Sequence, residues 1–360
     1  MITEKYRAEI ESGRIPAGER LPSSAALAEI SGVSRLTADR AVEELQRLGL
    51  VKRDGRRGTV VCHREIPSTK RIALIVDQVD FEYSFPRPEL LSGIHAGLGT
   101  EYDLVICDSK ADPQREIELL NRMAEETDGI ICWPTDHSHA GSTINDLTAR
   151  GVPLVLLDRV PAGAVSHAVL SDSETAIRHS MDFLLERGHK RIALLTFDKP
   201  EVSTVIERCA VFAAVMEEHG LASQDLLRRY PASLEVAERA HFYPIVRDSL
   251  FSLVRSENPV TAVLCVQDLF GAAILRGAEE MNLAIPDDIE VVTFNDWRPT
   301  WLGRPWQAHR IVFQPGEMGD AAIEILRAQI NRTAGEAQVH RIPSRFITVD
   351  DALSAPSICP

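Results

Sequence analysis

The sequence lacks long apolar runs. No stretch approaches the ~18 consecutive apolar residues that a membrane-spanning helix requires. Residues 1–11 are charged throughout and have no apolar core of the kind that secretory signals contain. We therefore expect a cytoplasmic protein. Its 360 residues, 44 % of them hydrophobic, are enough for two or three globular domains.

Paired cysteines are absent as well. None of the six cysteines forms a CxxC pair, and their spacings match no zinc framework. We expect unpaired thiols in a reducing compartment at Cys62, Cys107, Cys132, Cys209, Cys265 and Cys359. The Asp-His-Ser-His run at 136–139 could supply metal ligands, but a polar loop after a strand is the simpler interpretation. We expect no metal and no cofactor.

Common catalytic motifs are missing too. The chain has no Gly-x-Ser-x-Gly elbow, no phosphate-binding loop and no His-Glu-x-x-His pair. It also has no Gly-x-Gly-x-x-Gly run after a predicted strand. These absences predict that the chain is not an enzyme.

Positive charge is scarce, and its distribution is uneven. The net charge of -14 argues at first against nucleic acid as a partner. Residues 1–66, however, hold 12 Lys and Arg against 10 Asp and Glu, and the run 52–57 concentrates positive charge. The N-terminal segment is therefore the one region that would not repel a DNA duplex as a whole.

Residues 31–50 have the pattern of the turn and second helix of a helix-turn-helix. Ser34 is a plausible N-cap, and Gly32 lies in the short turn before it. Apolar residues at helical spacing predict one buried stripe, formed by Ala38, Ala41, Val42, Leu45 and Leu48. The opposite face carries Leu36, Arg40, Glu43 and Arg47. An ordinary pair of antiparallel helices would show the same stripe, so this stretch alone leaves that alternative open.

The flanking residues predict a winged helix-turn-helix. A first helix is expected over 2–12, and Ser23 or Ser24 can cap a short second helix. After the third helix, strands at 49–53 and 58–61 flank an Asp54-Gly55 hairpin signal. The basic tip, Arg56-Arg57-Gly58, suits a phosphate or the minor groove, although a solvated hairpin tip would have the same composition.

These residues resemble the GntR family of bacterial transcription regulators. The shared pattern includes Ser12-Gly13, Pro16 to Ser23, Leu27-Ala28, Gly32 to Arg35 and Gly55 to Thr59. The resemblance implies that a recognition helix and a wing bind DNA. The candidate contacts are Ser23, Ser34, Arg35, Thr37, Arg40, Arg56, Arg57, Gly58 and Thr59. The chain departs from the family at Ser24-Ala25, where Glu-Arg is usual, and at Asp39, where a basic residue is common.

Beyond a polar linker at 62–70, apolar strands alternate with helical patterns. Strands are predicted at 71–76, 103–107, 129–132, 152–157, 191–195, 262–266 and 289–294. Helices are predicted at 89–98, 113–125, 173–187, 207–219 and 269–281. This alternation is typical of parallel sheets with helices on both faces. We expect an α/β domain at 71–350 with lobes at 71–170 plus 313–340 and at 171–312 plus 341–350, followed by a tail at 351–360.

This part resembles the effector domain of LacI/GalR regulators, which has a periplasmic-binding-protein-like fold. The resemblance rests on 152–159, 186–195 and 285–296, with Gln314-Pro315 and Met318-Gly319. No LacI-type DNA-binding headpiece is present in residues 1–61. A GntR-type domain joined to such a core is similar to the arabinose-responsive regulators.

Predicted strand ends place polar and aromatic side chains at the mouth of a cleft, where a polyol would fit. The side chains at these strand ends are Asp77, residues 133–136, Asp158-Arg159, Gln267-Asp268 and residues 295–297. The resemblance adds Thr204, Arg208 and the segment 85–87. The candidate effector contacts are Phe85, Arg87, Asp136, Asp158, Arg159, Thr204, Arg208, Gln267, Asp268, Asn295 and Trp297.

Simpler roles remain open for three of these residues. Arg208, predicted near the head of a helix, could be a surface charge, Asp158 could cap a strand end, and Trp297 could belong to the core. Many sugar-responsive relatives carry aspartate where this chain has Asn295 and asparagine where it has Gln267. Sugar stays the leading expectation for the effector, without a specific sugar.

The combined expectation is a sequence-specific DNA-binding regulator, more often a repressor than an activator. A small polar effector, most plausibly a sugar or sugar derivative, would bind between the two lobes. The partners would be a pseudo-palindromic operator and a second copy of the chain in a homodimer. The alternative is a sugar-binding or sugar-converting protein whose N-terminus is a helical appendage. The basic wing favours the regulator.

Overall fold

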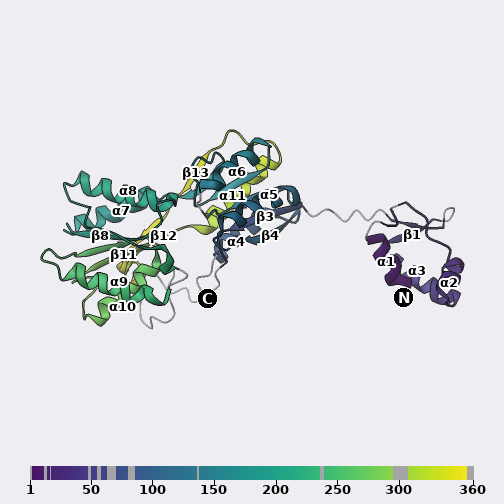
Figure 1. Cartoon of the computed structure of the whole chain (residues 1–360), viewed down its shortest axis with the longest axis horizontal. Helices are drawn as coiled ribbons and strands as arrows, with labels where there is room; N and C mark the ends of the chain where they lie inside the picture. The colour runs from purple at the N-terminus through teal and green to yellow at the C-terminus, as the bar shows by residue number, and fades with distance from the viewer. Residues whose placement is uncertain are drawn as a thin grey trace. The chain divides into compact units, whose positions relative to one another are not determined.

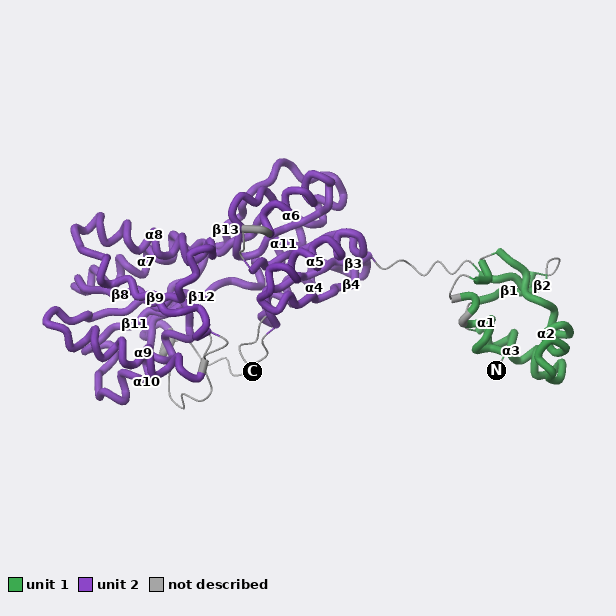
Figure 2. The backbone as a smooth tube through the Cα atoms, viewed as in Figure 1, with its two compact units in different colours: residues 1–69 green, residues 70–360 purple. Residues whose placement is uncertain are grey.

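The computed structural model divides into two compact units, residues 1–69 and 70–360, each treated by itself (Figure 2). It describes residues 2–11, 14–16, 18–47, 50–54, 58–62, 70–79, 86–135, 138–235, 239–294 and 307–354. No helix in these ranges is long and apolar enough to cross a bilayer. Within the same ranges, no three His, Cys, Asp or Glu side chains are grouped as a metal site would need, and Asp136 and His137 lie outside them.

The N-terminal unit is a winged helix-turn-helix. Its elements are α1 (Ile2–Glu11), α2 (Ser24–Ser31), α3 (Arg35–Arg47), β1 (Val51–Asp54) and β2 (Gly58–Val61). The strands pair antiparallel, with Asp54 opposite Gly58 at the tip and Val51 opposite Val61 at the base. This confirms the predicted order of three helices and a hairpin.

The predicted apolar stripe of α3 forms the centre of this small core. Ala38, Ala41, Val42 and Leu45 are buried against Leu21, Leu27 and residues of α1, whereas Leu48 lies outside the described residues. Arg40, Glu43 and Arg47 on the opposite face are exposed. Burial of one face therefore fixes which side of α3 is presented to solvent.

The C-terminal unit contains two six-stranded sheets. The first has the order β13-β7-β6-β5-β3-β4 and is parallel throughout. Its strands are β3 (Lys70–Val76), β4 (Tyr102–Asp108), β5 (Gly129–Cys132), β6 (Leu154–Leu157), β7 (His167–Ser171) and β13 (Val339–Ile342). Three residues assigned to the second lobe from the sequence, Ser171, Arg341 and Ile342, therefore belong to the first sheet, because Ser171 ends β7 and β13 pairs with β7. Lys70, assigned to the linker, is the first residue of β3.

The second sheet has the order β14-β12-β11-β10-β8-β9 and is parallel except for its edge strand β14. Its strands are β8 (Ile192–Asp198), β9 (Leu227–Pro231), β10 (Ala262–Cys265), β11 (Glu290–Phe294), β12 (His309–Val312) and β14 (Arg345–Ile347). The chain passes between the two sheets at 171–192, 312–339 and 342–345. Several separate connections between lobes are what a hinge-type domain requires.

Helices cover both faces of each sheet (Figure 1). On the first sheet, α4 (Pro88–Leu98) and α11 (Pro315–Ile330) pack on one face, and α5 (Pro113–Glu126) and α6 (Ser138–Ala149) pack on the other. On the second sheet, α7 (Ser173–Glu186) and α8 (Ser203–Glu218) lie opposite α9 (Arg239–Val254) and α10 (Asp268–Glu280). Two short elements, the 3-10 helix η1 (Ala232–Glu235) and α12 (Val349–Ser354), complete the unit. The predicted α/β architecture is confirmed.

Close packing of α11 on α4 brings the late part of the chain back to the first lobe. A Cβ atom on Gly93 would lie 2.3 Å from the carbonyl oxygen of Gly316, and one on Gly319 would lie 2.6 Å from that of Leu90. Only glycine permits this approach of two helix backbones. As a result, Pro315 and Met318 at the start of α11 stand beside the first-lobe residues at the mouth of the cleft.

Candidate functional site

Capping residues define the helix-turn-helix: one begins α2, one ends it at the turn, and one begins α3. Ser23 caps α2, because its side chain accepts a hydrogen bond from the backbone N–H of Ala26 at 3.3 Å, so Ser24 is the first helical residue. Gly32 ends α2 with φ +66°, a conformation that favours glycine. Ser34 Oγ then accepts from the backbone N–H of Thr37 at 3.2 Å and lies 2.8 Å from Thr37 Oγ1. Ser23, Ser34 and Thr37 thus have defined structural roles, whatever they contact in DNA.

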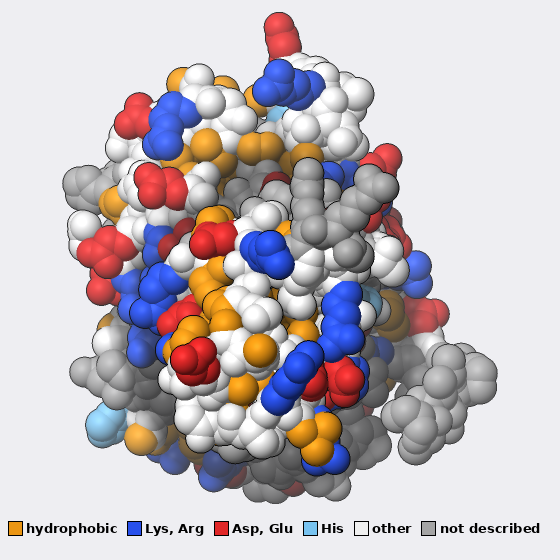
Figure 3. Space-filling view, turned by 90° about the vertical axis from the view of Figure 1, so that its right-hand side faces the viewer, with side chains coloured by type: hydrophobic (Ala, Val, Ile, Leu, Met, Phe, Trp, Pro, Cys, Tyr) orange, Lys and Arg blue, Asp and Glu red, His pale blue; other side chains and the backbone are white. Residues whose placement is uncertain are grey.

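The exposed face of α3 carries the predicted DNA contacts. Arg35, Thr37 and Arg40 are all solvent-exposed at its N-terminal end. Near the C-terminal end, Arg47 instead forms an ion pair with Glu44 at 2.7 Å, within the same helix. The exposed face of α3 carries basic and hydrophobic side chains next to one another, which suits a partner that offers both phosphates and base edges. Figure 3 shows basic, acidic and hydrophobic side chains mixed on the side of the molecule that it draws.

The wing is braced by a residue that the sequence pattern did not single out. Arg20 forms a β-bridge with Val60, and its guanidinium lies against Gly58, where a Cβ atom would come within 2.9 Å of Arg20 Nε. Gly58 also has φ +79°. The positive φ is what favours glycine at position 58, because the flexible end of the Arg20 side chain could move away from a Cβ atom, and Arg20 adds positive charge to the wing. Arg56 and Arg57 lie outside the described residues, and Thr59 is half-buried in β2.

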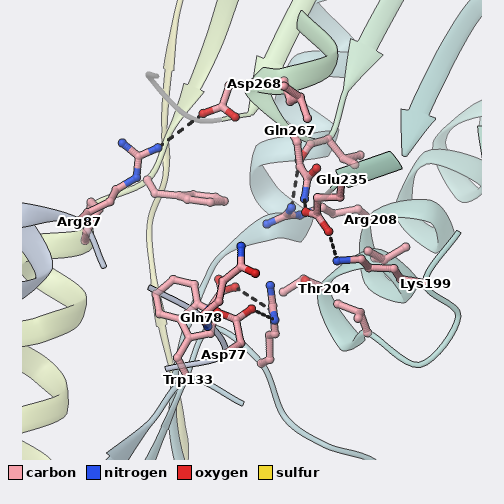
Figure 4. A pocket seen from close by; sticks show the side chains of 18 of the residues that line it. Asp77, Gln78, Arg87, Trp133, Lys199, Thr204, Arg208, Glu235, Gln267 and Asp268 are labelled. Carbon is pink, nitrogen blue, oxygen red and sulfur yellow. Dashed lines mark hydrogen bonds and ion pairs between the residues drawn. The ribbon is translucent and has the colours of Figure 1, made fainter. Parts of the chain in front are cut away.

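A cavity of about 220 Å³ lies between the two lobes of the C-terminal unit (Figure 4). The first lobe contributes Asp77, Gln78 and Trp133, and the second contributes Lys199, Thr204 and Gln267. Leu90, Phe313 and Met318 add apolar surface. The cavity has the mixed lining of a small-molecule site, with a few polar groups placed among apolar ones.

Two strand ends of the first lobe are joined by an ion pair at this cavity. Arg159, just after β6, donates from Nη1 to Asp77 Oδ2 at 2.8 Å, and also to the carbonyl oxygen of Pro134 at 3.2 Å. Asp77 directly follows β3. The pair joins side chains from β3 and β6, two strands that are separated by β5 in the sheet. Both side chains lie at the carboxyl ends of their strands, where ligands bind in parallel sheets.

Asp158 is buried in a backbone conformation that is unusual for aspartate. Its φ is +59°, its side chain accepts from Ser171 Oγ at 3.4 Å, and its backbone N–H is bonded to Val169. Burial raises the pKa of its carboxyl, against the opposing effect of the nearby Arg208 and Arg159 guanidinium groups. Positive φ at a non-glycine residue is a feature that clusters at binding sites. Asp158 therefore stays a candidate effector contact, and its role as a strand-end cap remains an alternative.

Arg208 is buried, with only 6 % of its surface exposed. The helix that carries it starts at Ser203 rather than at 207, so Arg208 lies in the second turn and faces the cavity. Its Nε donates to Ser173 Oγ and its Nη1 to the Val266 carbonyl, both at 3.2 Å, and its guanidinium lies 4.3 Å from the Phe294 ring centre. Burial lowers its pKa, while Asp158 opposes that shift. The alternative that Arg208 is a surface charge is wrong.

Sequence reasoning missed two charged residues of the second lobe. Lys199 and Glu235 form an ion pair at the cavity, and Gln267 Nε2 donates to Glu235 Oε1 at 3.1 Å (Figure 4). Lys199 directly follows β8, which continues three residues beyond the predicted strand. The strand-end rule would have found Lys199 had that end been placed correctly. Glu235 ends η1 after β9, a strand that the sequence pattern did not predict.

Some of the remaining predicted effector contacts line the cavity, and others lie outside the residues that the structure describes. Thr204 lines the cavity at the start of α8, and Arg87 faces Asp268 with 3.6 Å between Nη2 and Oδ2. Arg87, Asp158, Arg159, Thr204, Arg208, Gln267 and Asp268 therefore surround one cavity. The other four predicted contacts, Phe85, Asp136, Asn295 and Trp297, lie outside the described residues.

Comparison with known proteins assigns both units. Residues 1–61 match the family of bacterial regulatory proteins called gntR, and residues 181–348 match the periplasmic binding protein-like domain. The chain is 26 % identical over 303 residues to the arabinose metabolism transcriptional repressor of Geobacillus stearothermophilus. This alignment covers 80 % of this chain and 79 % of that protein.

Other known proteins are similar over about two thirds or more of the chain. Catabolite control protein A of Priestia megaterium is 22 % identical over 247 residues, covering 68 % of this chain and 71 % of that protein. The structure of the trehalose repressor from Escherichia coli superposes on this chain with a TM-score of 0.58 at 20 % sequence identity. The superposition covers 78 % of this chain and 100 % of that one. These relatives are regulators, in line with the expectation that the chain is not an enzyme. The chain is a DNA-binding transcription regulator, in which residues 1–61 match the gntR family and residues 181–348 match the periplasmic binding protein-like domain.

Proposed function

We propose that this regulator is a repressor controlled by a small polar effector, a sugar or sugar derivative, bound in the cavity between its lobes. The observation that carries the proposal is the pair of buried charges, Asp158 and Arg208, at one cavity that both lobes line. Burying ionised groups is costly, so side chains kept there are commonly functional.

The chemistry of the lining supports a sugar. Carboxylates accept hydrogen bonds from hydroxyl groups, guanidinium groups donate to hydroxyl oxygens, and the Gln267 amide can do both. Trp133 and Phe313 provide flat apolar surface for the C–H face of a sugar ring. Two relatives have names that refer to sugars, arabinose in one and trehalose in the other.

The proposed switch is closure of the two lobes around the effector. Asp77 and Arg159 belong to one lobe and Thr204, Gln267 and Arg208 to the other, so each lobe supplies part of the hydrogen-bonding shell. An effector that contacts both parts binds the closed form more tightly than the open form, and this difference in affinity shifts the population. We propose that the shift changes operator affinity through the N-terminal units of a homodimer bound to a pseudo-palindromic operator in the cytoplasm.

Two experiments separate this proposal from the alternative of a sugar-binding or sugar-converting protein. In a gel-shift assay with genomic fragments, the full chain should retain specific fragments that a chain lacking residues 1–69 releases. In a thermal-shift screen of sugars, an effector present at 100 times its Kd should add about 2.7 kcal/mol of stability. Sugar binding without any retained fragment would support the alternative.

A further inference from the structure

An unusual apolar residue lies on the solvent face of α3. Leu36 is 64 % exposed and projects opposite the buried stripe of Ala38, Val42 and Leu45. Within the described part of the N-terminal unit, the large exposed hydrophobic residues are Ile30, Val33 and Leu36, all in the helix-turn-helix. An apolar side chain displayed at this place contributes nothing to the core, so its surface is available to a partner.

The charges around Leu36 indicate which partner. Arg35 precedes it, and Arg40 lies one helical turn further on the same face, both exposed. A second copy of this surface would bring arginines against arginines, whereas a DNA duplex offers phosphates to both side chains and leaves a base edge between them. Charge complementarity therefore favours the major groove of DNA as the occupant.

We propose that Leu36 determines operator specificity by contacting the 5-methyl group of a thymine. In the major groove the thymine methyl is the apolar feature of a base edge, while adenine, guanine and cytosine present hydrogen-bonding groups there. Leucine cannot pair with those groups and would leave them desolvated and unsatisfied. Its position as the second residue of α3 places Leu36 in the part of a recognition helix that meets base edges. The inference rests on α3 being the recognition helix.

The test removes the methyl group from the DNA and the leucine from the protein. An operator is first selected with the full-length chain from random-sequence duplexes, and each thymine is then replaced by deoxyuridine, which lacks only the 5-methyl group. We expect one position in each half-site where the replacement weakens binding about fourfold, because the complex then loses the burial of one methyl group. Leu36→Ala should bind the thymine and uracil operators equally.

Two further variants control for indirect effects. Ile30→Ala removes an equally exposed side chain, 62 % accessible, from α2 and should keep the uracil sensitivity. Leu36→Met keeps an apolar side chain of similar length and should keep it too. Since Leu36 is outside the core, the Leu36→Ala variant should melt at the same temperature as the wild type.

Three results would overturn the inference. The first is uracil sensitivity that persists unchanged in Leu36→Ala, and the second is an operator in which no thymine can be replaced with loss of affinity. The third is equal loss of uracil sensitivity in Ile30→Ala, which would show that the effect does not come from Leu36. If selection enriches no sequence at all, the assignment of α3 as the recognition helix fails, and this inference fails with it.

Discussion

Arg87 and Asp268 face each other across the cleft between the lobes, with 3.6 Å between Nη2 of the arginine and Oδ2 of the aspartate. Arg87 is the N-cap residue of α4 in the first lobe, and Asp268 is the first residue of α10 in the second. Each therefore belongs to the N-terminal end of a helix that borders the cavity (Figure 4). An ion pair at this position can form only when the lobes are close together.

We expect Asp268→Asn to weaken effector binding by favouring the open form. Both side chains keep some contact with solvent, so the pair should contribute no more than about 1 kcal/mol, or roughly fivefold in affinity. Calorimetric titration with the effector measures the change. Glu218→Gln, which removes the exposed pair between Arg178 and Glu218 within the second lobe, is the matched control and should not alter affinity. Equal effects of both substitutions would contradict a role for the pair in closure.

Arg208→Ala should abolish the response to effector and leave effector-free DNA binding intact. Coupling between effector and operator sites is typically about 1–3 kcal/mol, so a roughly 5–150-fold change in operator affinity should vanish. Operator titration with and without effector measures it, and Asp158→Asn should behave likewise. Melting curves of the same variants are needed as well, because removing Arg208 takes away one of the two guanidinium groups near the buried Asp158. Arg159 remains, with its Nε 3.8 Å from Asp158 Oδ2, so the loss of stability should not exceed about 3–5 kcal/mol. A variant that still responds at wild-type effector concentrations would remove that residue from the site.

Arg35→Ala should reduce binding to the specific operator by about 1–3 kcal/mol if Arg35 contacts a base edge. Arg57→Ala should instead weaken all sequences alike and lower the salt-dependence slope by about 1, as expected of a phosphate contact. Titrations at several salt concentrations distinguish the two. Arg47→Ala is the control, because Arg47 is paired with Glu44 at the far end of α3. Wild-type behaviour of both test variants would contradict the DNA-binding assignment.

Acid should destabilise the C-terminal unit through Glu290. This buried carboxylate accepts from Arg187 Nε at 2.7 Å, His189 Nε2 at 2.5 Å and His309 Nε2 at 2.9 Å. Burial acts to raise the pKa of Glu290, but these hydrogen bonds outweigh it and lower the pKa overall. The stability that the carboxylate contributes is therefore present above its unfolded pKa and is lost as pH falls through the folded one.

His309 changes stability in the same direction. Its Nδ1 accepts from the backbone N–H of Val349 at 3.1 Å, so its proton lies on Nε2 and the ring is neutral. Burial lowers its pKa, against the opposing effect of Glu290, with Arg187 and Asp350 also close by. A lowered pKa means that stability falls once pH drops below the ordinary histidine value of about 6.5.

Thermal melts between pH 8 and pH 4 test this cluster. The melting temperature should fall below about pH 6.5. Glu290→Gln should cost about 2 kcal/mol near pH 7.5, because a charged guanidinium loses its partner while remaining half-exposed. The difference in melting temperature between variant and wild type should narrow as pH falls towards the lowered folded-state pKa of Glu290. A difference that is independent of pH would contradict the proposed role of the Glu290 charge.

The chain should be a homodimer in solution without DNA. A two-fold regulator reads two half-sites whose separation is set by its two recognition helices. Analytical ultracentrifugation at micromolar concentration should give twice the mass of one 39.8 kDa chain. Sedimentation as a single chain would contradict this prediction.

The candidate DNA-binding surface could be predicted from the sequence almost completely, because its determinants are local. Ser23 and Ser34 cap helices through atoms three residues away, and the buried stripe of α3 repeats within thirteen residues of one helix. Strands with uninterrupted apolar runs, such as β3 and β11, were predicted for the same reason. The strand ends in turn placed Asp77, Arg159 and Gln267 at the cleft.

Elements without a strong pattern needed the tertiary structure. Edge strand β13 is largely exposed and carries two polar residues, and edge strand β14 has only three residues, one exposed and two half-buried, so neither has an apolar run to detect. Helix α9 contains Pro244, a residue that normally argues against helix. The missing edge strands explain why the lobe boundary near residue 341 was placed two residues too early.

The sequence by itself determined which residues could form helices, caps, strands and strand ends, because those preferences act over a few neighbouring residues. Only the tertiary structure decided which charges are buried and which partner each one has. Arg208 is buried because α8 begins four residues earlier than its apolar pattern indicated and packs beneath Phe294 and the Val266 carbonyl. Lys199 meets Glu235 only through the pairing of β8 with β9. Desolvation and ion pairing depend on contacts between residues far apart in the sequence, and the pattern of a few neighbouring residues does not determine those contacts.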